Sequence, residues 1–263
     1  MMDKKDVEHG LLPKVGRYDF MVEPFHCDFR NRFFAGHLGN AMLNAADYHS
    51  NDRGYGMTFL NTIHRTWVLS RFAFELNSMP LAYDKITIST WVESAIKSFT
   101  SRNFTVKNSE TNEIYGYGRS IWALIDTESR QPANLLEIKD GLIGSYIETS
   151  EPCPIAKPGR VTMDKGAALV REMDTCYSDV DVNGHVNSVK YIEHILDLFD
   201  IDFYRNHRLQ RFEIAYVTEA HGGDKLSFYL EQKSDIEFCV KITRHIPEEI
   251  EVVRSLIRFV NDK

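Results

Sequence analysis

The chain has 263 residues, of which 43% are hydrophobic and 26% are charged, and its formal net charge is −7. This composition is that of a globular protein with a packed core, and it excludes disordered, collagen-like and coiled-coil proteins. An acidic chain has no electrostatic attraction for a phosphate backbone, so no nucleic acid partner is expected. The length allows either one large domain or two small ones.

The cysteines and the chain start indicate the compartment. The four cysteines are scattered, and no two have the spacing of a zinc site, so we expect no metal. We expect no cofactor either. Sparse thiols are typical of a reducing compartment. The charged N-terminus leads into no apolar run, and no apolar stretch of about 18 residues could span a membrane. We therefore expect a cytoplasmic protein without membrane insertion.

Each half of the chain is predicted to contain one helix followed by four strands. Apolar periodicity predicts helices, and runs rich in β-branched and aromatic residues predict strands. In the first half the helix spans 36–50 and the strands span 66–76, 84–94, 99–108 and 113–126. In the second half the helix spans 185–200 and the strands span 209–217, 225–232, 236–244 and 250–260.

The two halves also resemble each other in sequence. A gapless shift that places Arg71 over Arg211 also aligns Phe72 with Phe212 and Asp84 with Asp224. A slightly longer shift aligns residues further upstream. Matches in the same order along both halves indicate an internal duplication. The upstream pairs are Asn40 with Asn183, Asn44 with Asn187, and Tyr48 with Tyr191.

These patterns predict an α+β fold. The connections between strands are too short for crossover helices, so the strands must be antiparallel. We expect two similar units, each a curved sheet around a buried helix, packed as a pseudo-dimer within one chain. The first unit spans 1–126, a proline-containing linker spans 127–160, and the second unit spans 161–263.

The densest polar cluster is the motif 178-SDVDVNGHVNSVKY. In an extended segment, Asp179, Asp181, Asn183 and His185 would all point to one face, because they alternate with other residues. The motif leads into the second predicted helix, with Asn183 or Gly184 as its cap. Unpaired N–H groups at such a helix start can stabilise an oxyanion or polarise a carbonyl. This combination predicts an active site.

Two other interpretations fit parts of this motif. Its first residues match the beginning of an EF-hand calcium loop, but the twelfth position, which requires a glutamate, is Lys190. Helix capping explains one or two of the polar side chains. Capping does not explain both asparagines, the histidine and the alternation together.

The motif from Asp179 to Tyr191 closely resembles the signature of the acyl-acyl-carrier-protein thioesterases of plants and bacteria. The stretches 66-TWVLSRFAFEL and 90-TWVES are similar to the N-terminal unit of that family. The resemblance covers roughly residues 15–260 and implies two tandem hotdog units. It also implies hydrolysis of acyl-carrier-protein thioesters to a free fatty acid at the end of fatty acid synthesis. The implied partner is an acyl carrier protein whose acyl chain is attached to 4′-phosphopantetheine, and a homodimer is a further expectation.

The resemblance also implies the catalytic residues. They are Asp181, Asn183, His185 and Glu219, with Ala220 where many plant members have a cysteine. Water is therefore the expected nucleophile. We expect Glu219 to act as general base, while Asn183 and the helix start hold the oxyanion. His185 would orient the water or protonate the leaving sulfur. Asp181 would orient Asn183 or fix the tautomer of His185 by a hydrogen bond.

The first half is expected to lack this chemistry. Under the two shifts, His185 lies over Met42 and Glu219 lies over Met79. One active site per chain is therefore expected. Because methionine is an adaptable apolar residue, Met42 and Met79 are candidates for lining an acyl pocket.

Docking of an acidic carrier protein on an acidic chain requires a local basic patch. The candidates are Arg205, Arg208 and Arg211 in 205-RNHRLQR, although a solvated helix end would explain that run equally well. Two other functions remain open. One is another hotdog enzyme, such as a hydroxyacyl dehydratase or an acyl-CoA thioesterase, and the other is a non-catalytic acyl-binding module.

Overall fold

The computed structural model describes residues 10–164, 166–245 and 248–262. The described residues form one ten-stranded sheet in which all neighbouring strands are antiparallel. The strands are β1 (Gly16–Met21), β2 (Arg65–Leu76), β3 (Lys85–Ile96), β4 (Phe99–Asn108), β5 (Ile114–Asp126), β6 (Ala168–Asp174), β7 (His207–Tyr216), β8 (Lys225–Gln232), β9 (Glu237–Arg244) and β10 (Ile250–Asn261). Their order is β1-β3-β4-β5-β2-β7-β10-β9-β8-β6, so each half contributes five adjacent strands. The predicted α+β fold is confirmed, and all eight predicted strands are present.

Strands β1 and β6 form the two edges of the sheet and were not predicted. Both are short, and charged residues interrupt their apolar positions, as in the β6 sequence ALVREMD. Edge strands of this kind are partly solvated and are commonly protected by charge, so they lack the apolar periodicity of central strands.

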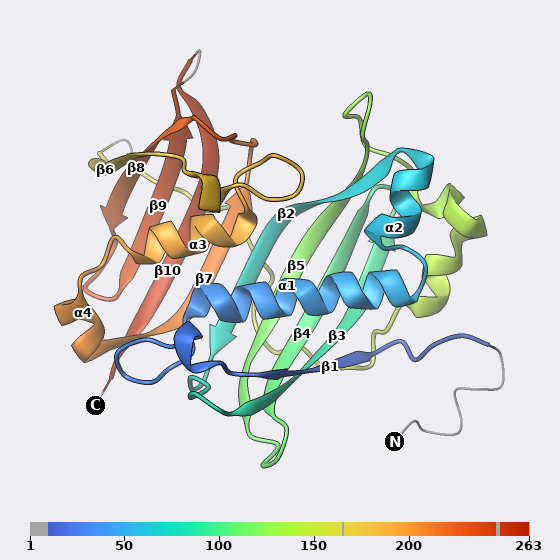
Figure 1. Cartoon of the computed structure of the whole chain (residues 1–263), viewed down its shortest axis with the longest axis horizontal. Helices are drawn as coiled ribbons and strands as arrows, with labels where there is room; N and C mark the ends of the chain where they lie inside the picture. Colours follow the sequence, from blue (N-terminus) through green and yellow to red (C-terminus); the bar gives the residue numbers. More distant parts are fainter. Residues whose placement is uncertain (1–9, 165, 246–247, 263) are drawn as a thin grey trace.

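The two main helices lie on the same face of the sheet and contact each other (Figure 1). Helix α1 (Ala35–Asp52) agrees with the prediction, whereas α3 (Ser188–Leu196) is shorter than predicted at both ends. The cap of α3 is Asn187, whose side chain accepts a hydrogen bond from the Val189 N–H at 2.9 Å. The predicted caps Asn183 and Gly184 were wrong, because both lie in the loop before the helix. The short helices are α2 (Met57–Leu60) and α4 (Ile201–Asn206), with 3-10 turns η2 (Pro24–His26), η3 (Asn61–Ile63), η4 (Leu135–Tyr146) and η5 (Tyr177–Asp179).

Among the described residues, no helix has both the length and the apolar character that crossing a membrane requires.

The two halves join where β2 pairs with β7. Ala73 lies opposite Glu213, and these are also the two residues that the gapless repeat aligns with each other. Phe74 lies opposite Phe212, and their rings stack at a centroid distance of 5.7 Å. A pseudo-two-fold axis therefore passes through the Ala73–Glu213 pair, as expected for a pseudo-dimer within one chain.

The repeat continues in the loops before the two helices, but with a different shift from the predicted one. Residues 24–35 and 177–188 have the same succession of 3-10 turn, bridge, bend and helix start. This match places His185 over Arg32.

The predicted upstream alignment was therefore wrong. Asn40 lies inside α1, whereas Asn183 precedes α3, so the two are not equivalent. For the same reason Met42 is not the counterpart of His185. The alignment of Glu219 with Met79 stands, because the turns that follow β7 and β2 match residue by residue. The pairs Asn44 with Asn187 and Tyr48 with Tyr191 fail together with the first.

The segment expected to be a linker packs against the sheet. Its η4 part forms a small separate core with Tyr55, Leu60 and Leu124. Residues 153–161, the crossing segment, then pass over the sheet face opposite the helices. Four arginines on four adjacent strands donate hydrogen bonds to carbonyl groups of this segment: Arg119 on β5, Arg71 on β2, Arg211 on β7 and Arg254 on β10. The crossing segment thus binds both halves.

Candidate active site

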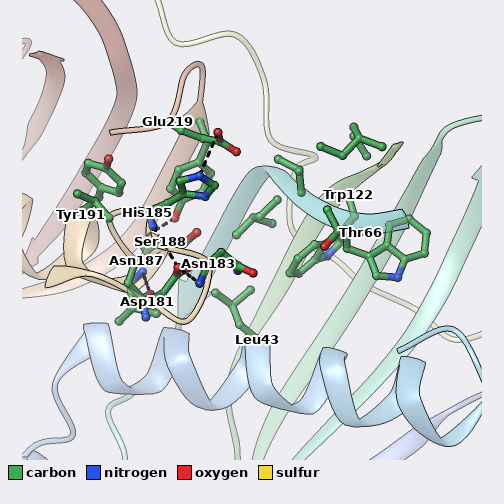
Figure 2. A pocket seen from close by; sticks show the side chains of 18 of the residues that line it. Leu43, Thr66, Trp122, Asp181, Asn183, His185, Asn187, Ser188, Tyr191 and Glu219 are labelled. Carbon is green, nitrogen blue, oxygen red and sulfur yellow. Dashed lines mark hydrogen bonds and ion pairs between the residues drawn. The ribbon is translucent and has the colours of Figure 1, made fainter. Parts of the chain in front are cut away.

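Asp181 determines the shape of the motif loop (residues 179–187). Its Oδ1 atom accepts hydrogen bonds from the N–H groups of Asn183, at 2.8 Å, and His185, at 3.4 Å. The loop also closes through two backbone hydrogen bonds between Asp181 and the pair Gly184 and His185. Gly184 has a φ of 81°, a left-handed conformation that glycine adopts without strain. The closed turn places the side chains of Asn183 and His185 at the pocket (Figure 2).

His185 and Glu219 face each other across two loops. Glu219 lies in the turn after β7, and the Val186 N–H donates to the Ala220 carbonyl at 2.8 Å, which joins this turn to the motif loop. The Nε2 atom of His185 lies 3.5 Å from Oε2 of Glu219, and each side chain is about one third exposed, at 27% and 33% (Figure 2). The structure therefore brings together an imidazole and a carboxylate that are far apart in the sequence.

Arg130 holds the other oxygen of Glu219. Its Nη2 atom donates to Glu219 Oε1 at 2.5 Å. Arg130 lies in the turn after β5, so it comes from the first half of the chain. The carboxylate is thus held on one side by a guanidinium and faces an imidazole on the other. Arg130 was not among the predicted site residues, because its position in the predicted linker carries no motif.

His221 completes a group that could coordinate a metal ion. Ligand atoms of His185, Glu219 and His221 lie within 4.8 Å of one another, and two histidines with a carboxylate can bind zinc. The guanidinium of Arg130 already occupies Glu219, however, and a second cation beside it would be repelled. The geometry therefore favours proton transfer over metal binding at this site.

The site opens into a cavity of about 800 Å³, the main pocket, which both halves line. The second half contributes the polar end, with the motif loop and Glu219. The first half contributes an apolar side from α1, β2 and β5 (Figure 2). A mostly preformed cavity with a few convergent polar groups is typical of small-molecule sites. The apolar residues include Leu43, Val68, Leu69, Trp122 and Ile125.

The start of α3 also lines the main pocket, through Asn187, Ser188 and Val189. The N-terminal end of a helix carries a partial positive charge, and its first N–H groups have no partner within the helix. The helix start therefore lies where a developing negative charge on a bound substrate would be stabilised.

The two predicted methionines do not line the main pocket. Met42 is fully buried between α1 and the sheet, where its Cε atom packs against Gly118. Met79 lines a different cavity beside Phe33 and Leu196. On α1 it is the next residue, Leu43, that reaches the main pocket, because a helix turns adjacent residues to different faces.

The three candidate docking arginines do not form one surface patch. Arg205 on α4 is exposed and pairs with Asp202. Arg208 on β7 turns toward Asp262. The prediction for Arg211 was wrong: it is buried and forms ion pairs with two carboxylates on the face opposite the helices.

Thiol chemistry is not supported by the geometry. Among the described residues, the main pocket has no cysteine in its lining. Cys239 is buried in β9, and burial raises the pKa of its thiol to about 11, which disfavours the thiolate. Cys176 is exposed outside the main pocket.

Comparison with known sequences supports the resemblance seen in the motif. The family model described as the acyl-ACP thioesterase N-terminal domain matches residues 13–141, and the model of the C-terminal domain matches residues 163–255. A palmitoyl-acyl carrier protein thioesterase of Gossypium hirsutum is 30% identical over 206 residues, covering 73% of this chain and 49% of that protein. An oleoyl-acyl carrier protein thioesterase of Arabidopsis thaliana is 26% identical over 189 residues, covering 68% of this chain and 51% of that protein. The chain spans about half the length of these curated relatives.

Solved structures share the whole fold. An acyl-ACP thioesterase from Bacteroides thetaiotaomicron has 46% sequence identity and a TM-score of 0.87, covering 94% of this chain and 98% of that one. The 12:0-ACP thioesterase from Umbellularia californica has 20% identity and a TM-score of 0.81, with coverage of 96% and 100%, and shows the shared fold. Since the two family models together account for most of the sequence, this chain belongs to the acyl-ACP thioesterase family and has its double-hotdog fold.

Proposed function

We propose that this protein hydrolyses the thioester bond of acyl-acyl carrier proteins and releases a free fatty acid and the holo carrier protein. Such a reaction terminates fatty acid synthesis. The observation that carries the proposal is the pairing of His185 with Glu219 at 3.5 Å, at the boundary between the polar and apolar sides of the main pocket. Family membership and the relatives described above support the same substrate class.

The pocket suggests how the substrate lies. An acyl chain would extend along the apolar side of the first half, which includes Leu69. Leu43 and Trp122 lie on the same side (Figure 2). The thioester would then lie beside the motif loop, with the pantetheine arm leaving toward solvent near Arg130, which is 47% exposed. In this arrangement the first unit binds the chain and the second supplies the chemistry.

The reaction would use water as the nucleophile. Glu219 takes a proton from the water, and the resulting hydroxide attacks the thioester carbon. Asn183 and the start of α3 stabilise the oxyanion that forms. The intermediate then collapses with cleavage of the carbon–sulfur bond. The thiolate accepts the proton that Glu219 removed, and the fatty acid releases its own proton to solvent and leaves as a carboxylate.

His185 and Arg130 orient these groups. A water molecule held between Nε2 of His185 and Oε2 of Glu219 would form a hydrogen bond to the imidazole and lie within reach of the base. His185 can also carry the proton to the sulfur. Arg130 keeps the carboxylate turned toward His185, and Asp181 acts through the backbone of the motif loop.

The test uses Glu219→Gln and His185→Ala, purified as folded protein, with hydrolysis of acyl-carrier-protein thioesters of several chain lengths followed by thiol release. Each variant should lose roughly 10²- to 10⁴-fold in rate. His221→Ala is the matched control, because it removes a neighbouring imidazole that has no role in the proposed reaction and should leave the rate within a few fold.

Near-normal turnover in both Glu219→Gln and His185→Ala would refute the proposed mechanism. The same assay separates the alternatives. A dehydratase would form an enoyl product without free thiol, and an acyl-CoA thioesterase would prefer acyl-CoA. A binding module would retain lipid without turnover.

We further propose that the protein acts in the cytoplasm, which is supported by four free thiols. Arg205 is the exposed candidate for contact with the acidic carrier protein, so Arg205→Glu should slow carrier-protein substrates more than small soluble thioesters. A homodimer stays a prediction, to be checked by light scattering.

A further inference from the structure

The main pocket has a counterpart related by the pseudo-two-fold axis. This second pocket has a volume of about 360 Å³ and lies between the loop before α1 and the helices α3 and α4. Each pocket is lined in part by the helix of the opposite half. Leu43 of α1 lines the main pocket, and Leu196, at the equivalent position on α3, lines the second pocket. In the second pocket, the positions of Asp181, His185 and Glu219 are occupied by Asp28, Arg32 and Met79.

The second pocket has lost the proton-handling pair and kept an apolar cavity. Arg32 cannot replace the imidazole of His185, and Met79 cannot replace the base Glu219. Hydrolysis by the proposed route is therefore excluded in the second pocket. Its volume lies within the range of ligand sites, which begins at about 300 Å³. Phe29, Phe34 and Ile201 remain substantially exposed around it. The other apolar residues of its lining are Phe33, Ala35, Leu196, Phe199, Tyr204 and Leu209.

Two arginines that line the second pocket, Arg32 and Arg208, pair with a carboxylate that lies outside this lining, that of Asp262. The Oδ2 atom of Asp262 lies 2.8 Å from Nη1 of Arg30 and 2.5 Å from Nη1 of Arg32. Nε of Arg208 lies 4.0 Å from Oδ1 of the same residue. Three guanidinium groups therefore converge on one carboxylate, with Asp28 as a second anion on Arg32. Arginine recognises carboxylates through charge-assisted hydrogen bonds, so this end of the second pocket is suited to an anionic head group.

We propose that the second pocket binds one fatty acid anion. Its chain lies among the phenylalanines and Met79, and its carboxylate takes the place of Asp262 on Arg32 and Arg208. The inference rests on the proposed function only in that the two pockets arose from one kind of acyl site. A free fatty acid is the product of the proposed reaction. The second pocket would therefore fill as the product accumulates, and the catalytic residues would stay accessible.

Met79 allows this binding to be measured directly. It lines the second pocket, whereas the described lining of the main pocket includes no methionine. Protein labelled with [methyl-13C]methionine is titrated with decanoate below its micelle concentration, and the Met79 signal is assigned with Met79→Leu. The Met79 signal should shift and saturate. The fully buried Met42 serves as an internal reference in the same spectrum, because it lines neither pocket.

Two variants test the head-group site. Asp262→Asn removes the competing carboxylate and should tighten decanoate binding roughly tenfold, the effect expected of a hydrogen bond to a charged group. Arg208→Gln should weaken it by a similar factor. Arg205→Gln is the matched control, since this nearby arginine pairs with Asp202 and does not line the second pocket. Decanol, which has the same chain without the charge, should bind far more weakly.

An unchanged Met79 signal in both the natural protein and Asp262→Asn would overturn the proposal, and so would equal binding of decanol and decanoate. This result is independent of the hydrolysis assay. Absent thioester hydrolysis with a normal Met79 response would refute only the proposed function. Normal hydrolysis with a Met79 signal that decanoate does not shift would refute only the second site.

Discussion

Asp28 and Asp181 make the same turn in the two halves of the chain. Each carboxylate accepts hydrogen bonds from the N–H groups two and four residues further on. For Asp28 these are Arg30 and Arg32, at 2.8 and 2.9 Å. The first-half turn has no catalytic histidine, so the turn is a property of the fold that exists without the chemistry. We therefore expect Asp181 to act by shaping the loop that carries His185.

Substitutions at Asp181 should separate shape from charge. Asp181→Asn keeps an oxygen that accepts both N–H groups, so we expect kcat to fall by less than about tenfold, whereas Asp181→Ala should lower it by roughly 10²-fold because the loop loses its turn. Asp28→Ala is the matched control. It should cost about 1–2 kcal/mol of unfolding free energy and leave kcat unchanged. If Asp181→Asn is as inactive as Asp181→Ala, the carboxylate charge itself is required.

Arg130 should matter for kcat through the orientation of Glu219. Without the hydrogen bond to Oε1, the carboxylate can rotate away from His185, and small displacements of a reacting group cost large factors in rate. Arg130→Gln should lower kcat by about tenfold with a smaller change in KM. Arg130→Lys should recover part of the loss.

The control for Arg130 is Arg65→Gln. Arg65 pairs with Asp126, whose side chain closes the same turn, but it does not touch Glu219. A loss in Arg65→Gln equal to that in Arg130→Gln would assign the effect to the turn and not to the contact with Glu219.

Arg211 should be a stability residue. It lies between Glu75 and Glu213, and Arg211→Met would leave Glu213, which is 7% exposed, as an uncompensated buried charge. We expect a loss of about 3–5 kcal/mol in unfolding free energy, measured with urea. Adding Glu213→Gln should restore part of it. The exposed Arg205→Met should change stability by less than about 0.5 kcal/mol. A similar small loss in Arg211→Met would show that the network contributes little.

His49 should make the free energy of unfolding decrease at low pH. Its ring is 1% exposed, and burial together with the cations Arg102 and Arg53 lowers its pKa to about 2, while its Nε2 atom donates to the Lys14 carbonyl. In the unfolded chain a histidine takes up its proton near pH 6.5. Below that pH the unfolded state binds one proton more than the folded state, so stability falls by about 1.4 kcal/mol per pH unit.

The corresponding measurement compares urea unfolding at pH 7 and pH 5 for the natural protein and His49→Gln. Glutamine can keep the hydrogen bond to the Lys14 carbonyl and does not titrate. The natural protein should lose about 2 kcal/mol more than the variant between these pH values. Parallel losses would show that His49 is protonated in the folded state.

Much of the fold could be predicted because its signals are local. The alternation of Ile86 and Ile88 in β3, for example, follows from one apolar sheet face, although the polar Thr87 on the other face is buried as well. Contacts between distant segments had no such signal. Neither Arg130 nor Leu43 belongs to a motif, and their place at the site depends on how the halves pack. The length of α3 was overestimated because apolar residues continue past Leu196 into the short α4.

The proposed catalytic residues could be named from the motif and, for Glu219, from the family resemblance, but their geometry could not. Glu219 meets His185 only because the turn after β7 lies beside the motif loop. The predicted upstream alignment failed because both halves contain asparagines near their helices. Identical residues at non-equivalent positions, inside one helix and before the other, look like a repeat in the sequence. Equivalence of Asp28 and Asp181 became visible only from the backbone.

The unbroken β2–β7 ladder has a mechanical consequence. Five consecutive residue pairs, from Arg71 opposite Ala215 to Glu75 opposite Arg211, hold the halves together in one rigid sheet. The main pocket lies between those halves, yet they cannot swing apart without breaking backbone hydrogen bonds. If an acyl chain is the substrate, as proposed, it must therefore pass the surface loops, and we expect the loops around Asn183 and Arg130, and not a hinge between the halves, to set the rate of its arrival and departure.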